Sequence, residues 1–177
     1  KAARPAAGKA AQIVASRHGV KPEQLSSGSR RTIDGLQQAG YDVTPCADGI
    51  QALESQAGEP SDLLVLDLMM PGLDGLDVIK ALRAAGSGCH AVDLVMKGEI
   101  ENAFCAVRPP GHHAGPMKGE GFCLFNNVAI GALHALETGA QKVAIIDFDR
   151  HHGNGTQDIV ETRGQGKVLL VSSYQDG

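Results

Sequence analysis

The chain has 177 residues, 42% of them hydrophobic and 20% charged, and it contains no tryptophan. This composition is typical of a globular protein with one ordinary-sized core, here built from Leu, Val, Ile and Ala. No apolar run approaches the ~20 residues that a membrane-spanning helix requires, which excludes a helical membrane protein.

The charges are unevenly distributed along the chain, and the cysteines indicate a reducing compartment. The formal net charge is −4, but residues 1–31 carry seven basic side chains against one acid, and the remainder carries nine against nineteen. The four cysteines form no C-x-x-C pair, and the first residues lack the apolar segment of a signal peptide. We therefore expect reduced thiols and a cytoplasmic location.

Residues 1–30 form a basic segment. The Ala-rich run Ala10–Ala15 predicts a short helix that ends before Gly19. The whole segment is therefore either a helical segment or an irregular basic tail. A basic cluster is typical of phosphate binding, but charges at a chain end are more often a solvated tail. We predict no nucleic-acid partner.

Residues 31–86 alternate between helical and strand patterns. The predicted elements are a helix over 33–39 ended by Gly40, an edge strand over 41–46 that contains Pro45, a helix after 48–49, a buried strand over 63–66, and a helix capped by Asp74. This alternation predicts a parallel sheet covered by helices.

The same segment resembles the receiver domain of two-component response regulators. YDVTPCADGIQAL and DLLVLDLMMPGLDGLDVIKALR follow the pattern of that family, with its flavodoxin-like fold, and Asp67 falls on its phospho-acceptor. Phosphotransfer there needs Mg²⁺ held by an acidic pair at the end of the first strand. No such pair precedes Arg31, so we expect Asp67 to be inactive. A phospho-receiver signalling module using Asp67 remains an alternative function.

Residues 87–177 form the third predicted segment, joined to the second within 84–88. The predicted elements are a helix over 89–96, a strand over 102–107, a buried helix over 127–136 with His134 in the core, a buried strand over 143–146, and a strand over 168–171.

Three polar residues follow the strand over 143–146. Asp147, Asp149 and His151 alternate along an extended chain, so they line one face at its carboxyl end, where ligands bind in open parallel sheets. A glycine-rich turn at 153–155 and the tandem pair His112-His113 accompany them. Mixed oxygen and nitrogen donors of this kind predict a metal site.

These residues resemble the zinc-dependent histone deacetylase and acetylpolyamine amidohydrolase superfamily. RPPGHHA, GFCLFNNVAIGA and DFDRHHGNGTQ match its signature blocks in order. The resemblance implies a parallel α/β core with helices on both faces, present here in part, and an acetyl-lysine-like or acetylpolyamine amide as small-molecule or peptide substrate. It implies that Asp149 and His151 bind zinc. His112 and His113 would be the catalytic pair, oriented by Asp147 and Asn154 respectively. Gly121 and Phe122 would line the acyl channel, and a structural potassium ion would lie near Asp147.

The resemblance also implies two residues that this chain does not supply. The third zinc ligand, an aspartate, and the tyrosine that stabilises the transition state come from later segments in that superfamily. Enzymatic activity is therefore an open question, and a truncated or hybrid chain without activity is a further alternative. If the site is real, a ring nitrogen of His112 or His113 should lie within ~6 Å of an Asp147 or Asp149 carboxylate.

Overall fold

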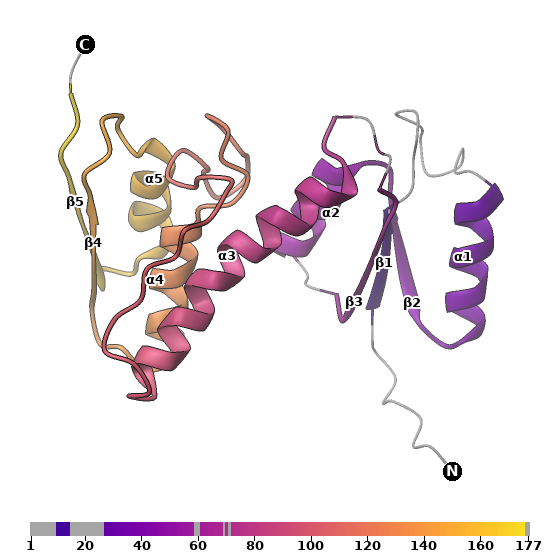
Figure 1. The fold of residues 1–177 in the computed structure, drawn as a ribbon, viewed down its shortest axis with the longest axis horizontal. Helices are drawn as coiled ribbons and strands as arrows, with labels where there is room; N and C mark the ends of the chain where they lie inside the picture. The colour runs from indigo at the N-terminus through magenta and orange to yellow at the C-terminus, as the bar shows by residue number, and fades with distance from the viewer. Residues whose placement is uncertain (1–9, 15–26, 59–60, 69, 71, 176–177) are drawn as a thin grey trace. The chain divides into compact units, whose positions relative to one another are not determined.

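The computed structural model describes residues 10–14, 27–58, 61–68, 70 and 72–175, so most of the predicted basic segment lies outside the described residues. The chain divides between Ile79 and Lys80 into two compact units (Figure 1). The first unit contains residues 31–79 of the receiver-like segment, and the second contains the rest of it and the deacetylase-like motifs.

The N-terminal unit is a parallel sheet with helices on opposite sides (Figure 1). Its elements are β1 (Ala10–Val14), α1 (Ser27–Gln38), β2 (Asp42–Cys46), α2 (Gly49–Gly58), β3 (Leu63–Leu66) and the start of α3 (Gly75–Met96). The strand order is β2-β1-β3, and both pairings are parallel. This is the first part of the flavodoxin-like order 2-1-3-4-5, which confirms the predicted α/β fold class.

Local signals explain where these elements begin and end. Gly40, with φ at +90°, follows α1, because a glycine adopts a left-handed conformation without a steric penalty. Pro45 is tolerated because β2 is an outer strand of the described sheet. The Asp48 carboxylate accepts the Gln51 backbone N–H at 2.9 Å and starts α2, and Asp74 accepts that of Asp77 at 2.8 Å and starts α3.

Two predictions for this unit are wrong. Ala10–Val14 is a strand and not part of a helix, because its backbone pairs with β2 on one side and with β3 on the other. β3 is not fully buried, and Leu63 is 39% exposed. The reason is that β3 is an outer strand of the described sheet, next to β1 alone.

The predicted join at 84–88 is not a break in the chain's helical structure. α3 runs without interruption through Gly86 and Gly88 to Met96. An interior glycine weakens a helix by only about 1 kcal/mol relative to alanine, and here tertiary packing offsets it. Gly88 faces the start of the next helix, where a Cβ added to it would make an ordinary contact of 3.5 Å with the Asn127 carbonyl oxygen.

The C-terminal unit places two helices against one face of a two-stranded parallel sheet. Its further elements are α4 (Asn127–Glu137), β4 (Val143–Asp147), α5 (Asn154–Arg163) and β5 (Val168–Ser172). β4 and β5 pair in register from Val143 with Val168 to Asp147 with Ser172. The core is formed by Ala132, Ile145 and Val168, whereas Ile146 and Val171 alternate to the opposite face.

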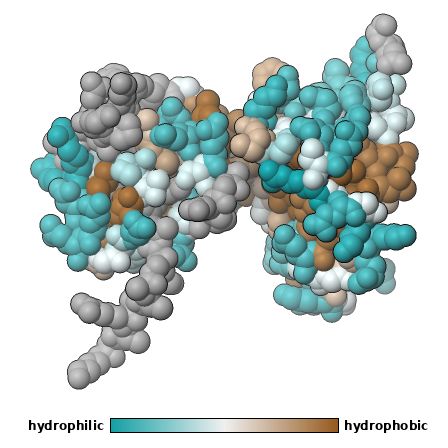
Figure 2. All heavy atoms as spheres, turned by 180° about the vertical axis from the view of Figure 1, so that it is seen from behind, coloured by the Kyte–Doolittle hydropathy of each residue, from teal (hydrophilic) through white to brown (hydrophobic). Residues whose placement is uncertain are grey.

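That opposite face of the sheet is apolar and exposed. Ile146 is 70% exposed, Phe148 86%, Leu169 62% and Val171 51%. Figure 2 shows apolar surface gathered on one side of this unit. Exposure of several large apolar side chains side by side is unusual in an isolated unit.

Several predictions fail in this unit. The strand over 143–146 and the helix over 127–136 are not fully buried, since Ile146 is 70% and Val128 45% exposed; each element packs into the described core through one face. Residues 102–107 do not form a strand, and Phe104 is 93% exposed, because the segment has no ladder partner among the described strands. His134 is not a core residue. Its Nε2 lies 2.7 Å from Asp93 on α3 at a half-exposed position, and this hydrogen bond lowers the pKa of the Asp93 carboxyl.

None of the helices in the described part of the chain combines the length and the apolar character that crossing a membrane requires.

Candidate functional site

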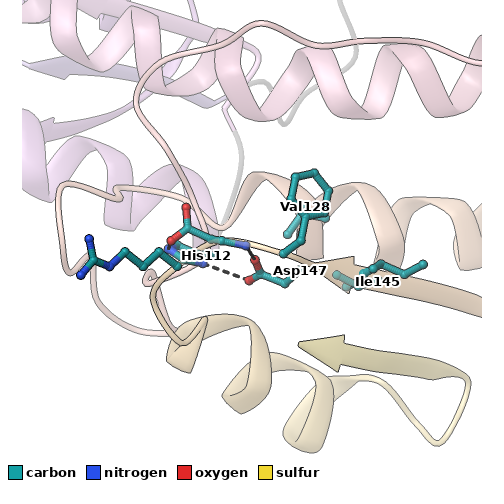
Figure 3. Close-up of a pocket in the computed structure, with 8 residues that line it drawn as sticks. His112, Val128, Ile145 and Asp147 are labelled. Atoms are coloured by element: carbon teal, nitrogen blue, oxygen red, sulfur yellow. Dashed lines mark hydrogen bonds and ion pairs between the residues drawn. The ribbon is translucent and has the colours of Figure 1, made fainter. Parts of the chain in front are cut away.

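The loop that carries the histidine pair folds over the carboxyl end of β4. His112 Nδ1 lies 2.9 Å from Asp147 Oδ2, and both side chains are largely buried, at 15% and 11% exposed (Figure 3). Because an ionised carboxylate only accepts, His112 donates its Nδ1–H. The expected approach of the histidine pair to within ~6 Å of an aspartate is confirmed.

The second histidine has its own partner on α5. His113 Nδ1 lies 2.7 Å from Asn154 Oδ1, and its ring centroid lies 4.1 Å from that of His112. A backbone bond ties α5 to this loop, since the Thr156 N–H donates to the His112 carbonyl oxygen at 3.0 Å. The two histidines therefore have separate partners, Asp147 and Asn154, from β4 and α5.

Asp149 and His151 follow β4 and face each other. Asp149 Oδ1 lies 3.1 Å from His151 Nδ1, and the side chains are 50% and 71% exposed. The His151 backbone N–H donates to the same Asp149 oxygen at 2.8 Å, which lowers the pKa of that carboxyl, and the side chains of His151 and His112 lower it further. The carboxylate is thus held ionised, as a metal ligand must be.

The spacing of these two donors suits zinc. Two ligands ~2.0–2.2 Å from a tetrahedral zinc ion lie ~3.3 Å from each other, close to the 3.1 Å between Asp149 Oδ1 and His151 Nδ1. His112 Nε2 lies 3.9 Å from Asp149 Oδ1, and the ring of His113 lies 6.1 Å from that of His151. Within the described ranges, no third His, Cys, Asp or Glu joins them to complete a cluster of metal ligands.

A hollow of about 440 Å³ opens beside this end of β4. Its walls come from the His loop, the start of α4 and the end of β4 with the residues after it: His112, Val128, Ile145, Ile146, Asp147, Phe148, Asp149 and Arg150 (Figure 3). Its lining combines polar side chains with aliphatic and aromatic ones, as in many small-molecule sites.

The Gly121-Phe122 turn lies against His113. Glu120 and Cys123 exchange two backbone hydrogen bonds of 2.9 and 3.0 Å, and the two residues between them have φ of +57° and +64°. Positive φ at both central positions defines a type I′ turn. A Cβ added at Gly121 would lie 2.6 Å from the His113 ring. Phe122 is 92% exposed, and a bulky residue at positive φ is a strained position of the kind found at functional sites.

Sequence reasoning missed the residues that hold these parts together. Asn126 is 2% exposed, and Thr156 is fully buried. The Asn126 amide accepts the Ala129 N–H and donates to the Ala114 carbonyl and to the Thr156 hydroxyl, each at 3.0 Å. An asparagine directly before an apolar helical run is a cap signal, but its other two partners cannot be found from sequence spacing.

Gly153 is a second residue that the geometry needs. A Cβ there would lie 2.5 Å from Asp147 Oδ2 and 3.3 Å from His112 Nδ1. Only a glycine lets the backbone before α5 pass this close to the His112–Asp147 pair.

The alternative phospho-acceptor, Asp67, directly follows β3 in the N-terminal unit. β1 lies beside β3 in parallel, with Val14 opposite Leu66. In the sequence, Val14 is followed by Ala15, Ser16 and Arg17, none of which is acidic, and these three lie outside the described residues.

This fold and this arrangement of histidines and aspartates define a class of protein. The family model of the histone deacetylase domain matches residues 75–177, more than half of the chain, and the chain belongs to that family. The model of the response regulator receiver domain matches residues 27–109, in agreement with the receiver-like segment.

Individual relatives support this assignment. The chain is 52% identical over 101 residues to type-2 histone deacetylase 2 of Dictyostelium discoideum, covering 53% of this chain and 6% of that protein. It is 49% identical over 96 residues to the acetylpolyamine amidohydrolase of Mycoplana ramosa, covering 54% and 27%. The crystal structure of the HDA15 HD domain matches with a TM-score of 0.57 and 27% identity, covering 94% of this chain and 54% of that one.

We expect Asn126→Ala to destabilise the C-terminal unit by about 2–4 kcal/mol, because it removes a helix cap and leaves buried partners unpaired. Urea unfolding measures the change. The exposed Asn102→Ala is the control and should shift stability by less than about 0.5 kcal/mol. An Asn126→Ala chain that unfolds at the same urea concentration as the wild type would contradict this role.

Proposed function

We propose that this chain carries the catalytic histidine pair and two zinc ligands of a deacetylase-like amide hydrolase. The observation that supports this most strongly is the convergence of two separately oriented histidines on the Asp149–His151 pair. The proposed substrate is an acetyl-lysine-like or acetylpolyamine amide, by analogy with relatives such as the acetylpolyamine amidohydrolase.

His113 is the proposed general base and acid. Its Nδ1–H donates to Asn154 Oδ1, which leaves the Nε2 lone pair to take a proton from the attacking water and return it to the leaving amine. His112 is held by Asp147 with its Nε2 directed towards Asp149. Zinc held by Asp149 and His151 would polarise the acetyl carbonyl and lower the pKa of water to about 7.

Two further assignments extend this proposal. Gly121 and Phe122 line the channel for the acyl group, which is consistent with the contact of their turn against His113. A potassium ion binds near Asp147. Ser172 pairs with Asp147 in the sheet, and its buried hydroxyl oxygen has no hydrogen-bond partner among the described residues, so it offers the kind of oxygen ligand that a hard cation prefers.

The hydrolase proposal is tested by acetate release from an acetyl-lysine peptide and from an acetylpolyamine with added zinc. We expect His113→Ala to lower the rate by about 10²- to 10⁴-fold, as loss of a general base does. His90→Ala, which removes an exposed histidine of α3, is the matched control and should keep the wild-type rate. Equal rates for wild type and His113→Ala on both substrates would refute the proposal.

Zinc binding by this 177-residue chain should be weak, because Asp149 and His151 supply two of the three protein ligands that a catalytic zinc site needs. We expect clearly less than one zinc per chain after dialysis, measured by elemental analysis. The remaining zinc should be lost in Asp149→Ala. Stoichiometric zinc that survives dialysis would show that another residue completes the site.

The receiver-like segment has a separate prediction. We expect no phosphate on Asp67 after incubation with acetyl phosphate and Mg²⁺, because the sequence has no acidic pair directly after Val14, at the end of β1, to bind the ion. Phosphate incorporation is measured by mass spectrometry, with Asp67→Asn as control. A modification present in the wild type and absent from Asp67→Asn would revive the signalling function.

A further inference from the structure

Asn154 lies between a carboxylate and an imidazole. Its Nδ2 donates to Glu120 Oε2 at 3.4 Å, while its Oδ1 faces His113 Nδ1 at 2.7 Å. We propose that Glu120 is a positioning residue that fixes the orientation of the Asn154 amide and, through it, the tautomer of His113. This inference rests on the proposed role of His113 as the base.

The available donors and acceptors favour one orientation of the Asn154 amide. A carboxylate only accepts, whereas an amide donates from one end and accepts at the other. If the Asn154 amide rotated by half a turn, its carbonyl oxygen would face the Glu120 carboxylate, and two acceptors would oppose each other. Glu120 therefore disfavours that orientation and keeps the Asn154 oxygen towards His113.

The amide orientation decides where the proton of His113 resides. A neutral imidazole carries one N–H and one lone pair, and the partner of one nitrogen selects the tautomer. With the Asn154 oxygen at Nδ1, the proton lies on Nδ1 and Nε2 is free to accept. With the amide nitrogen there, Nδ1 would accept, the proton would move to Nε2, and the ring could not act as a base at that atom.

Glu120 is well placed for this role. It begins the type I′ turn that contains Gly121, and a Cβ added at Gly121 would overlap the His113 ring. The turn that holds Glu120 is thus in contact with the histidine that it would control. Lys118 Nζ lies 3.4 Å from the same Glu120 oxygen, at an exposed position where an ion pair contributes little.

Glu120→Gln tests the proposal. The glutamine side chain has nearly the same shape as glutamate, but it can both donate and accept, so it can pair with the Asn154 amide in either orientation. The readout is ¹⁵N NMR of the imidazole nitrogens in the histidine-labelled 177-residue chain, without zinc or substrate. The measurement is made at about pH 8, where an ordinary histidine of pKa ~6.5 is neutral. We expect His113 to be mainly the Nδ1–H tautomer in the wild type. In Glu120→Gln, the ratio of the two tautomers should fall about three- to tenfold.

A second substitution separates positioning from a general structural effect. Asp at position 154 can only accept, so Asn154→Asp combined with Glu120→Gln should restore the Nδ1–H tautomer of His113. Lys118→Gln is the matched control and should leave the tautomer ratio of His113 unchanged. The tautomer ratio of His112, which pairs with Asp147, should stay the same in all of these variants.

An unchanged His113 tautomer in Glu120→Gln, or no restoration by Asn154→Asp, would overturn the proposal. The NMR samples contain no substrate, so the tautomer measurement does not depend on turnover. Absence of acetate release would count against the hydrolase function without changing the conclusion about Glu120 and the tautomer of His113.

Discussion

The buried amide of Asn126 is the contact on which the rest of the site depends. It connects the first turn of α4, the loop after the histidine pair at Ala114, and α5 at Thr156. An unpaired polar group in such a place costs about 1–3 kcal/mol, so the three segments must meet in one geometry. Thr156 then binds the His112 carbonyl, and the loop is held over the end of β4. A polar network, and not the strand predicted over 102–107, brings the histidines to the aspartates.

The site has a protected side and an open side. The His112–Asp147 pair is largely buried, where hydrogen bonds are stronger and geometry is fixed. Asp149 and His151 are half or more exposed, so they are accessible to solvent and to an ion. The hollow beside β4 is lined by His112 and Asp147 of the buried pair and by Asp149 of the exposed pair. This division suits a site in which the buried Asp147 orients His112, while Asp149 and His151 are open to a ligand from solvent.

The two family resemblances overlap in one helix. The receiver model extends to residue 109 and the deacetylase model begins at residue 75, so both include α3. An amphipathic helix offers apolar positions at the same 3.6-residue period whatever it packs against. Asp74 caps the start of the helix within the receiver-like segment, and Gly88 lies against the start of α4 in the second unit. One helix therefore satisfies both patterns without a break.

The sequence by itself determined the local features: the parallel α/β alternation, the helix that starts after Asp48, the cap at Asp74, and the succession of Asp147, Asp149 and His151 at the end of the strand over 143–146. These depend on neighbours within a few residues, which the sequence states directly. Only the tertiary structure decided that Ala10–Val14 is a strand and that Asn126 joins three segments. It also decided that Glu120 reaches Asn154, 34 residues away in the chain. The physical reason is that strand pairing and buried hydrogen bonds are made between distant segments, and local propensity is too weak to specify which of them meet.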